Sequence, residues 1–266
     1  MRKIVECVPN FSEGRDAAVI EQITAAISAV EGVTLLDVDP GKDTNRTVVT
    51  LVGEPEAVKE AAFRGIQKAA ELIDMSSHAG AHPRMGATDV CPFIPVANMT
   101  MEECIQLAHE LGERVGKELG IPVYCYEYAA KCPERRNLAD IRKGEYEALP
   151  EKMKNPSFKP DFGPAEFNAK TGATVIGARD FLVAYNVNLN TRDKKLAHEI
   201  ALTIRESGCP KKDKHGNKVI DKDGNPVIQP GLLQCCKAVG WYIDEYGYAQ
   251  VSINLTNYTV TGIHHA

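Results

Sequence analysis

The sequence lacks the segments that mark membrane and secreted proteins. No run approaches the roughly 18–20 consecutive apolar residues of a membrane-spanning helix. The opening residues, MRKIVEC, lack the apolar core of roughly 7–15 residues that a signal peptide needs. We therefore expect a cytoplasmic protein with no membrane partner.

The sequence also lacks an excess of positive charge and any Cys-x-x-Cys motif. Its 31 Lys and Arg stand against 36 Asp and Glu, with the two signs interspersed. Without a basic face to neutralise phosphates, we expect no nucleic-acid partner. Most of the eight cysteines lie in apolar runs, which favours buried reduced thiols over disulfides.

What is present is the composition of a globular protein. Apolar residues make up 44% of the chain and charged residues 25%, which excludes a disordered or fibrous protein. At 266 residues, the length predicts about two domains or one large one.

The first half of the chain alternates strand and helix patterns. Residues 3–9 predict a strand, 20–30 a helix, 35–39 and 46–52 two strands, and 58–73 a second helix. A strand is predicted at 90–96. Thr100 and Glu103 form a capping-box pattern that opens a helix to about residue 120. A strand at 122–128 and helical residues at 137–153 follow, and a proline-rich connector completes this half.

The second half predicts β-α-β-β, with a strand at 181–190, a helix at 193–207 and strands at 236–244 and 249–258. Turn residues between 211 and 230 indicate an inserted hairpin. Both halves resemble split βαβ units, the ferredoxin-like arrangement. We therefore expect an α/β (α+β) protein of two ferredoxin-like subdomains, at 1–178 and 179–266, with the second shortened at its C-terminus.

The most unusual polar segment is residues 76–89, SSHAGAHPRMGATD. Its glycines allow close backbone approach to a ligand, and histidine suits proton transfer near pH 7. A plain surface loop is one alternative, and a metal site is another. Gly80 and Pro83 argue against the helix that would let His78 and His82 chelate together, and no further ligand is suitably spaced.

Three other features are candidates for binding. Asp37 and Asp39 should share one face of a strand that leads to Arg46, as a catalytic pair or as solvated turn residues. Residues 161–172 form a glycine- and proline-rich loop with two phenylalanines, either a ligand cradle or a linker. Asparagines at 186, 188, 190 and 254 line strand faces, which predicts either a solvent-exposed sheet or the wall of a cleft.

Across nearly the whole chain the motifs resemble the glutamate formimidoyltransferase (formiminotransferase) family. They are ECVPNFSEG (6–14), LDVD (36–39), TNRTV (44–48), HPRMGATDVCPFIPV (82–96), GEYEALPEK (144–152), DFGP (161–164), GATVIGAR (172–179) and VGWY (239–242). They occur in the family's order, and the resemblance is to the form without a cyclodeaminase domain.

The resemblance implies an activity and two substrates. The expected reaction moves the formimino group of N-formimino-L-glutamate to N5 of tetrahydrofolate, in histidine degradation and one-carbon metabolism. Tetrahydrofolate is then a co-substrate, no metal is needed, the substrates bind between the subdomains, and the protein is a homodimer.

The resemblance also assigns residues. The family's catalytic histidine falls on His82. Its folate-binding stretch falls on Gly163, Pro164, Ala165, Glu166, Phe167, Asn168, Ala169, Lys170, Thr171 and Gly172. From charge complementarity we add three substrate contacts: Asp39 for the cationic amidinium, and Arg46 or Arg84 for carboxylates.

Two other functions fit the same resemblance. One is formyl transfer between 5-formyltetrahydrofolate and glutamate at the same site. The other is a catalytically impaired folate-binding copy, since the family continues with a helix and a strand beyond the pattern found here.

Overall fold

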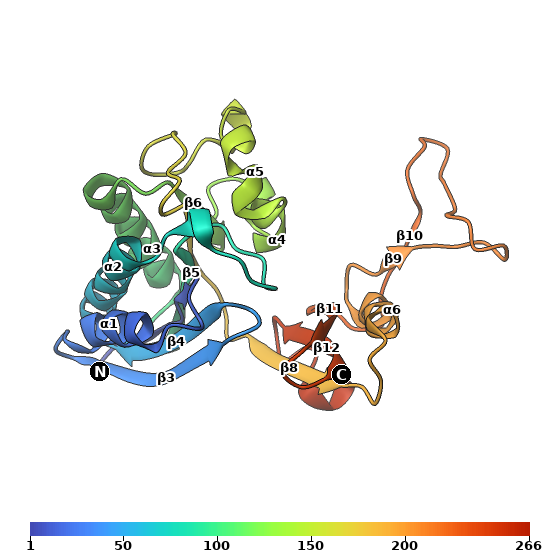
Figure 1. The fold of residues 1–266 in the computed structure, drawn as a ribbon, viewed down its shortest axis with the longest axis horizontal. Helices are drawn as coiled ribbons and strands as arrows, with labels where there is room; N and C mark the ends of the chain where they lie inside the picture. The colour runs from blue at the N-terminus through green and yellow to red at the C-terminus, as the bar shows by residue number, and fades with distance from the viewer. The chain divides into compact units, whose positions relative to one another are not determined.

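The computed structural model describes residues 1–266, which divide into two compact units, Met1–Arg179 and Asp180–Ala266. Figure 1 traces both units along the chain. All eight cysteines carry free thiols. None of the helices is both long enough and apolar enough to pass through a membrane.

The first unit contains a ferredoxin-like core. Its elements are β1 (Ile4–Cys7), β2 (Asn10–Phe11), α1 (Ala17–Ser28), β3 (Val33–Gly41), β4 (Arg46–Gly53), α2 (Pro55–Leu72) and β5 (Thr88–Ala97). β1 and β2 act as one interrupted strand, antiparallel to β4 on one side and to β5 on the other. β3 pairs with the far edge of β4. The predicted split βαβ arrangement is confirmed.

Two parallel strands extend this core. α3 (Met101–Arg114) begins at the predicted capping box and continues into a π-helical turn, Val115–Leu119. β6 (Val123–Glu127) and β7 (Thr174–Ala178) follow, and β7 lies between β5 and β6, parallel to both. The sequence patterns did not predict β7. All five of its residues are buried, so it shows no alternation of polar and apolar residues.

The two faces of this sheet are covered unequally. α1, α2 and α3 lie along one face (Figure 1). On the other face, α4 (Leu138–Arg142) and α5 (Glu145–Lys152) pack over β5, β6 and β7. β4 alternates buried residues with partly exposed ones, beginning with Arg46. We call the face of β1–β4 that lies opposite α1 and α2 the open face, and polar side chains there can meet a ligand.

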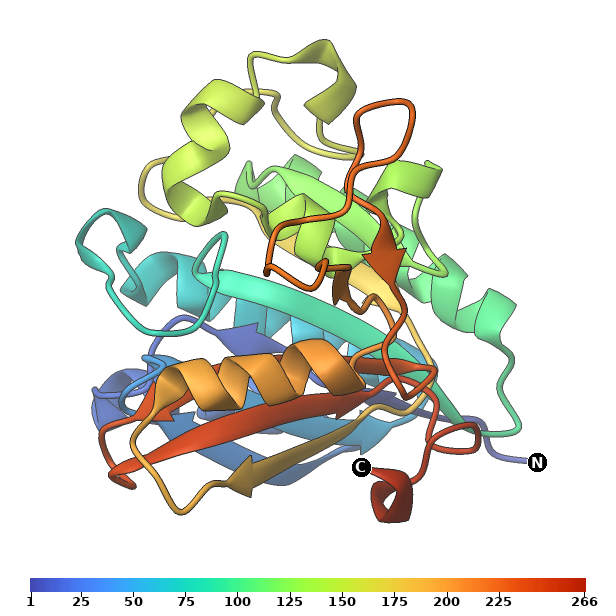
Figure 2. The ribbon, with the colours of Figure 1, turned by 90° about the vertical axis from the view of Figure 1, so that its right-hand side faces the viewer.

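The second unit repeats the β-α-β-β part of the core, which consists of the interrupted strand β1/β2, α1, β3 and β4. The corresponding elements are β8 (Val183–Asn188), α6 (Lys194–Ile204), β11 (Cys236–Ile243) and β12 (Tyr248–Leu255), with the antiparallel order β11-β12-β8. This confirms the predicted β-α-β-β order. α6 covers one face of the sheet (Figure 2). Between α6 and β11, a short pair, β9 (Cys209–Pro210) and β10 (Ile228–Gln229), begins an arm that extends from the unit (Figure 1).

Gly240 of β11 sets the distance between α6 and its sheet. A Cβ at this position would lie 2.1 Å from the backbone nitrogen of His198 in α6. We expect Gly240→Ala to lower the free energy of unfolding by about 1–3 kcal/mol, because backbone must move to relieve the overlap. Urea unfolding measures the change. Val239→Ala, at an exposed neighbouring position, is the control, and equal stability of the two variants would contradict this packing.

Candidate active site

The loop that carries His82 is held against the turn between β3 and β4. Asn45, in a left-handed conformation with φ of 47°, donates from its side chain to the carbonyl of Ala79 at 3.0 Å. The ring Nε2 of His78 donates to the carbonyl of Asn45 at 2.9 Å. The Ala81 amide donates to the carbonyl of Asp43 at 3.0 Å. Together these bonds bring His82 to the end of the open face where β4 begins.

His82 has a defined tautomer. Its Nδ1 lies 2.7 Å from the carbonyl oxygen of Pro83. A carbonyl only accepts, so Nδ1 carries the proton and Nε2 keeps its lone pair. Burial, together with the positive charges of Arg46 and Arg142, lowers the pKa of His82 to about 3. The imidazole is therefore neutral at physiological pH, with Nε2 free to take a proton.

Arg46 is a cation without enough acceptors. Its Nη1 donates to the side-chain oxygen of Asn10 at 2.5 Å. Its Nε is buried and has no hydrogen-bond partner. Burial lowers the pKa of Arg46 to about 10, and the negative charges of Asp89 and Asp39 oppose this shift. The group stays protonated, so this end of the open face is prepared for an anion.

Asp89 and Arg142 form the neighbouring ion pair. Asp89 is fully buried and accepts from the Met85 amide at 2.9 Å. Arg142, from α4, donates to it through Nε at 3.3 Å and through a short bond from Nη2. One carboxylate therefore fixes both the His82 loop and α4. Because this carboxylate is occupied by Arg142, it does not supply the acceptor that Arg46 lacks.

Asp39 lies on the open face and shares it with Asp37, as their spacing predicted. Asp37 and Asp39 pair with Thr50 and Val48 of β4, on either side of a buried Val49. Their shared face holds despite a β-bulge between Leu35 and Asp37. Asp39 is exposed, and its charge acts on Arg46. The structure therefore brings Asp39, Arg46 and His82 to one end of the open face.

Arg84, the other arginine predicted to contact substrate, is bound by side chains of α5. It is buried, and its guanidinium binds Glu145 at 2.9 Å and Glu147 at 2.6 Å, both in α5. It also donates to the carbonyl and ring of His78. These bonds explain its raised pKa, with the Glu147 bond as the largest cause. Arg84 thus ties α5 to the His82 loop, and its donors are engaged by the protein itself.

The predicted folate segment, 163–172, joins the His82 loop at its C-terminal end. The Ala87 amide donates to the Thr171 carbonyl at 2.8 Å, and the Ala173 amide to that of Met85 at 3.1 Å. The contact is close, since a Cβ on Gly172 would lie 2.2 Å from the Met85 oxygen. The two segments that the resemblance singled out are therefore neighbours in space.

Ring and backbone contacts hold the rest of that segment. The hydroxyl of Tyr146 in α5 donates to the Ala169 carbonyl at 2.6 Å, and its ring lies 5.4 Å from that of Phe167. Lys170 donates to the Glu71 carbonyl at 2.9 Å. Gly163, with φ of +78°, fits against the carbonyl of Ile121 where a Cβ would approach to 2.4 Å. This position requires glycine for both reasons.

Sequence reasoning assigned no role to three residues of this region, Asn10, Arg142 and Tyr146. Asn10 and Tyr146 lie inside two of the family motifs, ECVPNFSEG and GEYEALPEK, and these motifs could have identified them. Arg142 sits in a polar helical stretch and meets Asp89 across 53 residues of chain. Nothing local in the sequence indicates that pairing.

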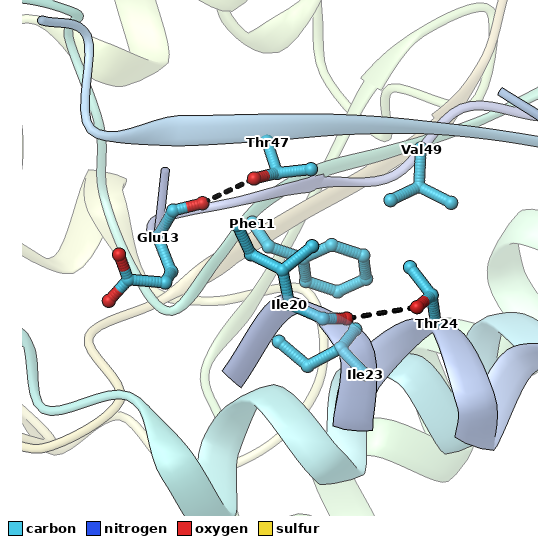
Figure 3. Close-up of a pocket in the computed structure, with 7 residues that line it drawn as sticks. All are labelled: Phe11, Glu13, Ile20, Ile23, Thr24, Thr47 and Val49. Carbon is cyan, nitrogen blue, oxygen red and sulfur yellow. Dashed lines mark hydrogen bonds between the residues drawn. The ribbon is translucent and has the colours of Figure 1, made fainter. Parts of the chain in front are cut away.

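A separate hollow lies on the opposite side of the sheet. It is lined by Phe11, Glu13, Ile20, Ile23, Thr24, Thr47 and Val49 (Figure 3). Its polar groups are satisfied internally, by bonds from Thr47 to the Glu13 carbonyl and from Thr24 to the Ile20 carbonyl. It holds no titratable group beyond Glu13, so we place the candidate site on the open face. No group of three or more His, Cys, Asp or Glu could hold a metal ion.

Two family models match the chain. The formiminotransferase domain, N-terminal subdomain, matches residues 4–179. The formiminotransferase domain matches residues 184–266.

Curated relatives match over almost all of this chain. Formimidoyltransferase-cyclodeaminase from Dictyostelium discoideum is 52% identical over 99% of the chain and 46% of its own length. Glutamate formimidoyltransferase from Thermoplasma acidophilum is 46% identical over 99% of the chain and 80% of its own length. Its counterpart from Streptococcus pyogenes is 44% identical over 97% and 79%. The chain thus spans about half the length of the bifunctional relatives and four fifths of the shorter ones.

The lowered pKa of His82 makes a prediction about acid stability. The unfolded imidazole takes a proton near pH 6.5 and the folded one near pH 3. The free energy of unfolding is therefore unaffected by the protonation of His82 above pH 6.5. It falls as the pH drops below that value, because the unfolded chain takes up the proton first. We expect His82→Gln to lose less stability than the wild type between pH 7 and pH 4.5, measured by urea unfolding. His215→Gln, at an exposed site, is the control, and identical pH profiles for His82→Gln and wild type would contradict the burial of a neutral ring.

Proposed function

Because the chain belongs to the formiminotransferase family, we propose that it transfers the formimino group of N-formimino-L-glutamate to N5 of tetrahydrofolate. The products are L-glutamate and 5-formiminotetrahydrofolate. One observation supports this most directly: a neutral histidine with a free Nε2 stands beside an arginine whose buried Nε lacks an acceptor. A base and an anion subsite are the two features that this reaction requires of the protein.

His82 moves the proton in this proposal. The N5 lone pair forms a bond to the amidine carbon, whose π electrons shift to its nitrogen, and a tetrahedral intermediate results. His82 Nε2 takes the proton from N5 and then gives one to the glutamate nitrogen. The bond from carbon to that nitrogen breaks and C=N re-forms, so protons and charge balance. Asp39, exposed on the open face, stabilises the cationic amidinium.

Arg46 holds a substrate carboxylate and also adjusts the base. With a pKa of about 3, His82 is a weak base in the free protein. The charge of Arg46 contributes to that low value, and a bound carboxylate would offset it. The pKa of His82 then rises from its low value, which makes the ring a stronger base. Arg84 has no part in this proposal, since Glu145 and Glu147 already bind it.

We assign folate binding to residues 163–172, as the resemblance implied. The supporting observation is that Thr171 and Gly172 lie against the Met85–Ala87 stretch of the His82 loop. A folate held by this segment would have its reacting end near His82. Homodimerisation and a cytoplasmic location stay predictions from the sequence.

The central prediction concerns His82. We expect His82→Gln to lower kcat about 10²–10⁴-fold, because proton transfer to a positioned base is lost. The assay follows glutamate release from N-formimino-L-glutamate in the presence of tetrahydrofolate, with His215→Gln as the matched control. A folded His82→Gln protein with near-normal turnover would overturn the assignment.

The same assay separates the other functions. A wild type that is active only with 5-formyltetrahydrofolate and glutamate would indicate formyl transfer. Tetrahydrofolate binding without turnover of either donor would indicate an impaired copy.

A second prediction concerns Arg46. We expect Arg46→Met to raise KM for N-formimino-L-glutamate by about 10–100-fold, the cost of losing a hydrogen-bonded charge. In the wild type, added L-glutamate should raise the pKa of His82, followed by the NMR shifts of its ring. That rise should be absent in Arg46→Met. Arg64→Met removes an arginine of α2 whose partner is Glu60 and is the control, and an unchanged KM in Arg46→Met would exclude Arg46 from substrate binding.

A further inference from the structure

Three polar side chains form a row across the sheet of the second unit. Trp241 of β11 pairs directly with Gln250 of β12, and Gln250 pairs directly with Asn188 of β8. These residues alternate with those that contact α6, such as Ala249 and Val251. The row therefore lies on the face opposite α6.

Two hydrogen bonds link the row. The Trp241 indole Nε1 donates to Gln250 Oε1 at 2.7 Å. Gln250 Nε2 donates to Asn188 Oδ1 at 2.7 Å. Gln250 is 4% exposed, whereas Asn188, at the end of the row, is exposed.

The chemistry of tryptophan gives this row one direction. An indole N–H can only donate, so it fixes the Gln250 amide with its oxygen toward Trp241. The Gln250 nitrogen must then face Asn188, which turns the Asn188 oxygen toward Gln250. The Asn188 amide nitrogen is left pointing away from the row, with donors free for another molecule. An exposed asparagine normally takes either orientation, but here one is selected.

We propose that Asn188 binds substrate, donating its side-chain N–H groups to a carboxylate or amide carbonyl oxygen, with Gln250 and Trp241 as positioning residues. The proposal rests on the function proposed above, because both substrates carry such oxygens. It assigns a ligand to part of the asparagine-lined face, which the sequence left open between solvent and cleft wall.

Two features of this row are not explained by a contribution to stability alone. Asparagine is disfavoured in strands, yet Asn186 and Asn188 follow one another on this face of β8. Burying an amide such as Gln250 gains little net stability even when it is hydrogen-bonded. A fixed donor at the exposed end of the row is what this arrangement provides.

Two substitutions test the direction of the row. Asn188→Ala removes the donor. Gln250→Glu keeps the shape but accepts from both neighbours, so Asn188 must turn its nitrogen inward and present its oxygen instead. Ser252→Asp adds the same negative charge two residues along β12, opposite Asn186, and leaves the row intact. It is the charge-matched control.

Isothermal titration calorimetry on the full chain measures the outcome, with N-formimino-L-glutamate and 5-formyltetrahydrofolate as separate probes. We expect Asn188→Ala and Gln250→Glu to raise Kd for one probe about 10-fold or more, and the probe that responds identifies the substrate bound. Ser252→Asp should stay within about twofold of the wild type. Thermal unfolding of each variant shows that its fold is kept.

Three results would overturn the proposal. Unchanged Kd values in Asn188→Ala would exclude the residue from binding, while wild-type turnover left the proposed function intact. An effect of Gln250→Glu no larger than that of Ser252→Asp would show that charge, and not donor direction, matters. A wild type that binds neither probe would remove the proposed function and this inference together.

Discussion

The partly buried guanidinium of Arg46 is the constraint around which the candidate site is organised. One nitrogen has an acceptor in Asn10, whereas Nε has none. The nearest buried carboxylate, Asp89, is already shared between Arg142 and the Met85 amide. A buried cation with too few acceptors costs stability, and such costs concentrate where a ligand is to be bound. In the proposed function, an anionic substrate supplies the acceptor that Arg46 Nε lacks.

The unequal covering of the first sheet explains why this charge lies where it does. α1–α3 pack against one face, and the residues of β4 that point there are apolar or small. On the other face α4 and α5 reach only the strands from β5 onward. Arg142, in α4, lies at the border between the covered and uncovered parts and donates to Asp89 there. The helix α4, which packs over β5, β6 and β7, therefore also contributes a charge to the candidate site.

The fold was predictable from the sequence to the extent that its signals are local. The capping box of α3, the alternation along β8 and the shared face of Asp37 and Asp39 follow from spacing alone. β7 was not predicted, because a strand buried on both faces has no alternation to detect. Arg84 shows a second limit: its partners, Glu145 and Glu147, lie about 60 residues away in the chain, so spacing does not reveal them. Only the folded structure reveals that the charge is already neutralised.

In the proposed mechanism, Arg46 and His82 illustrate how a weak base can serve in catalysis. Each positive charge near the ring makes protonation harder, so a site that attracts carboxylates necessarily weakens its own base. The two effects are thermodynamically linked. A carboxylate bound at Arg46 raises the proton affinity of His82. Protonation of His82 would strengthen the binding of that carboxylate by the same free energy. In the proposed mechanism, the base strength of His82 therefore increases when substrate is present. An isolated histidine of ordinary pKa would instead be partly protonated before substrate arrived, and the tautomer set by Pro83 would then no longer leave Nε2 free.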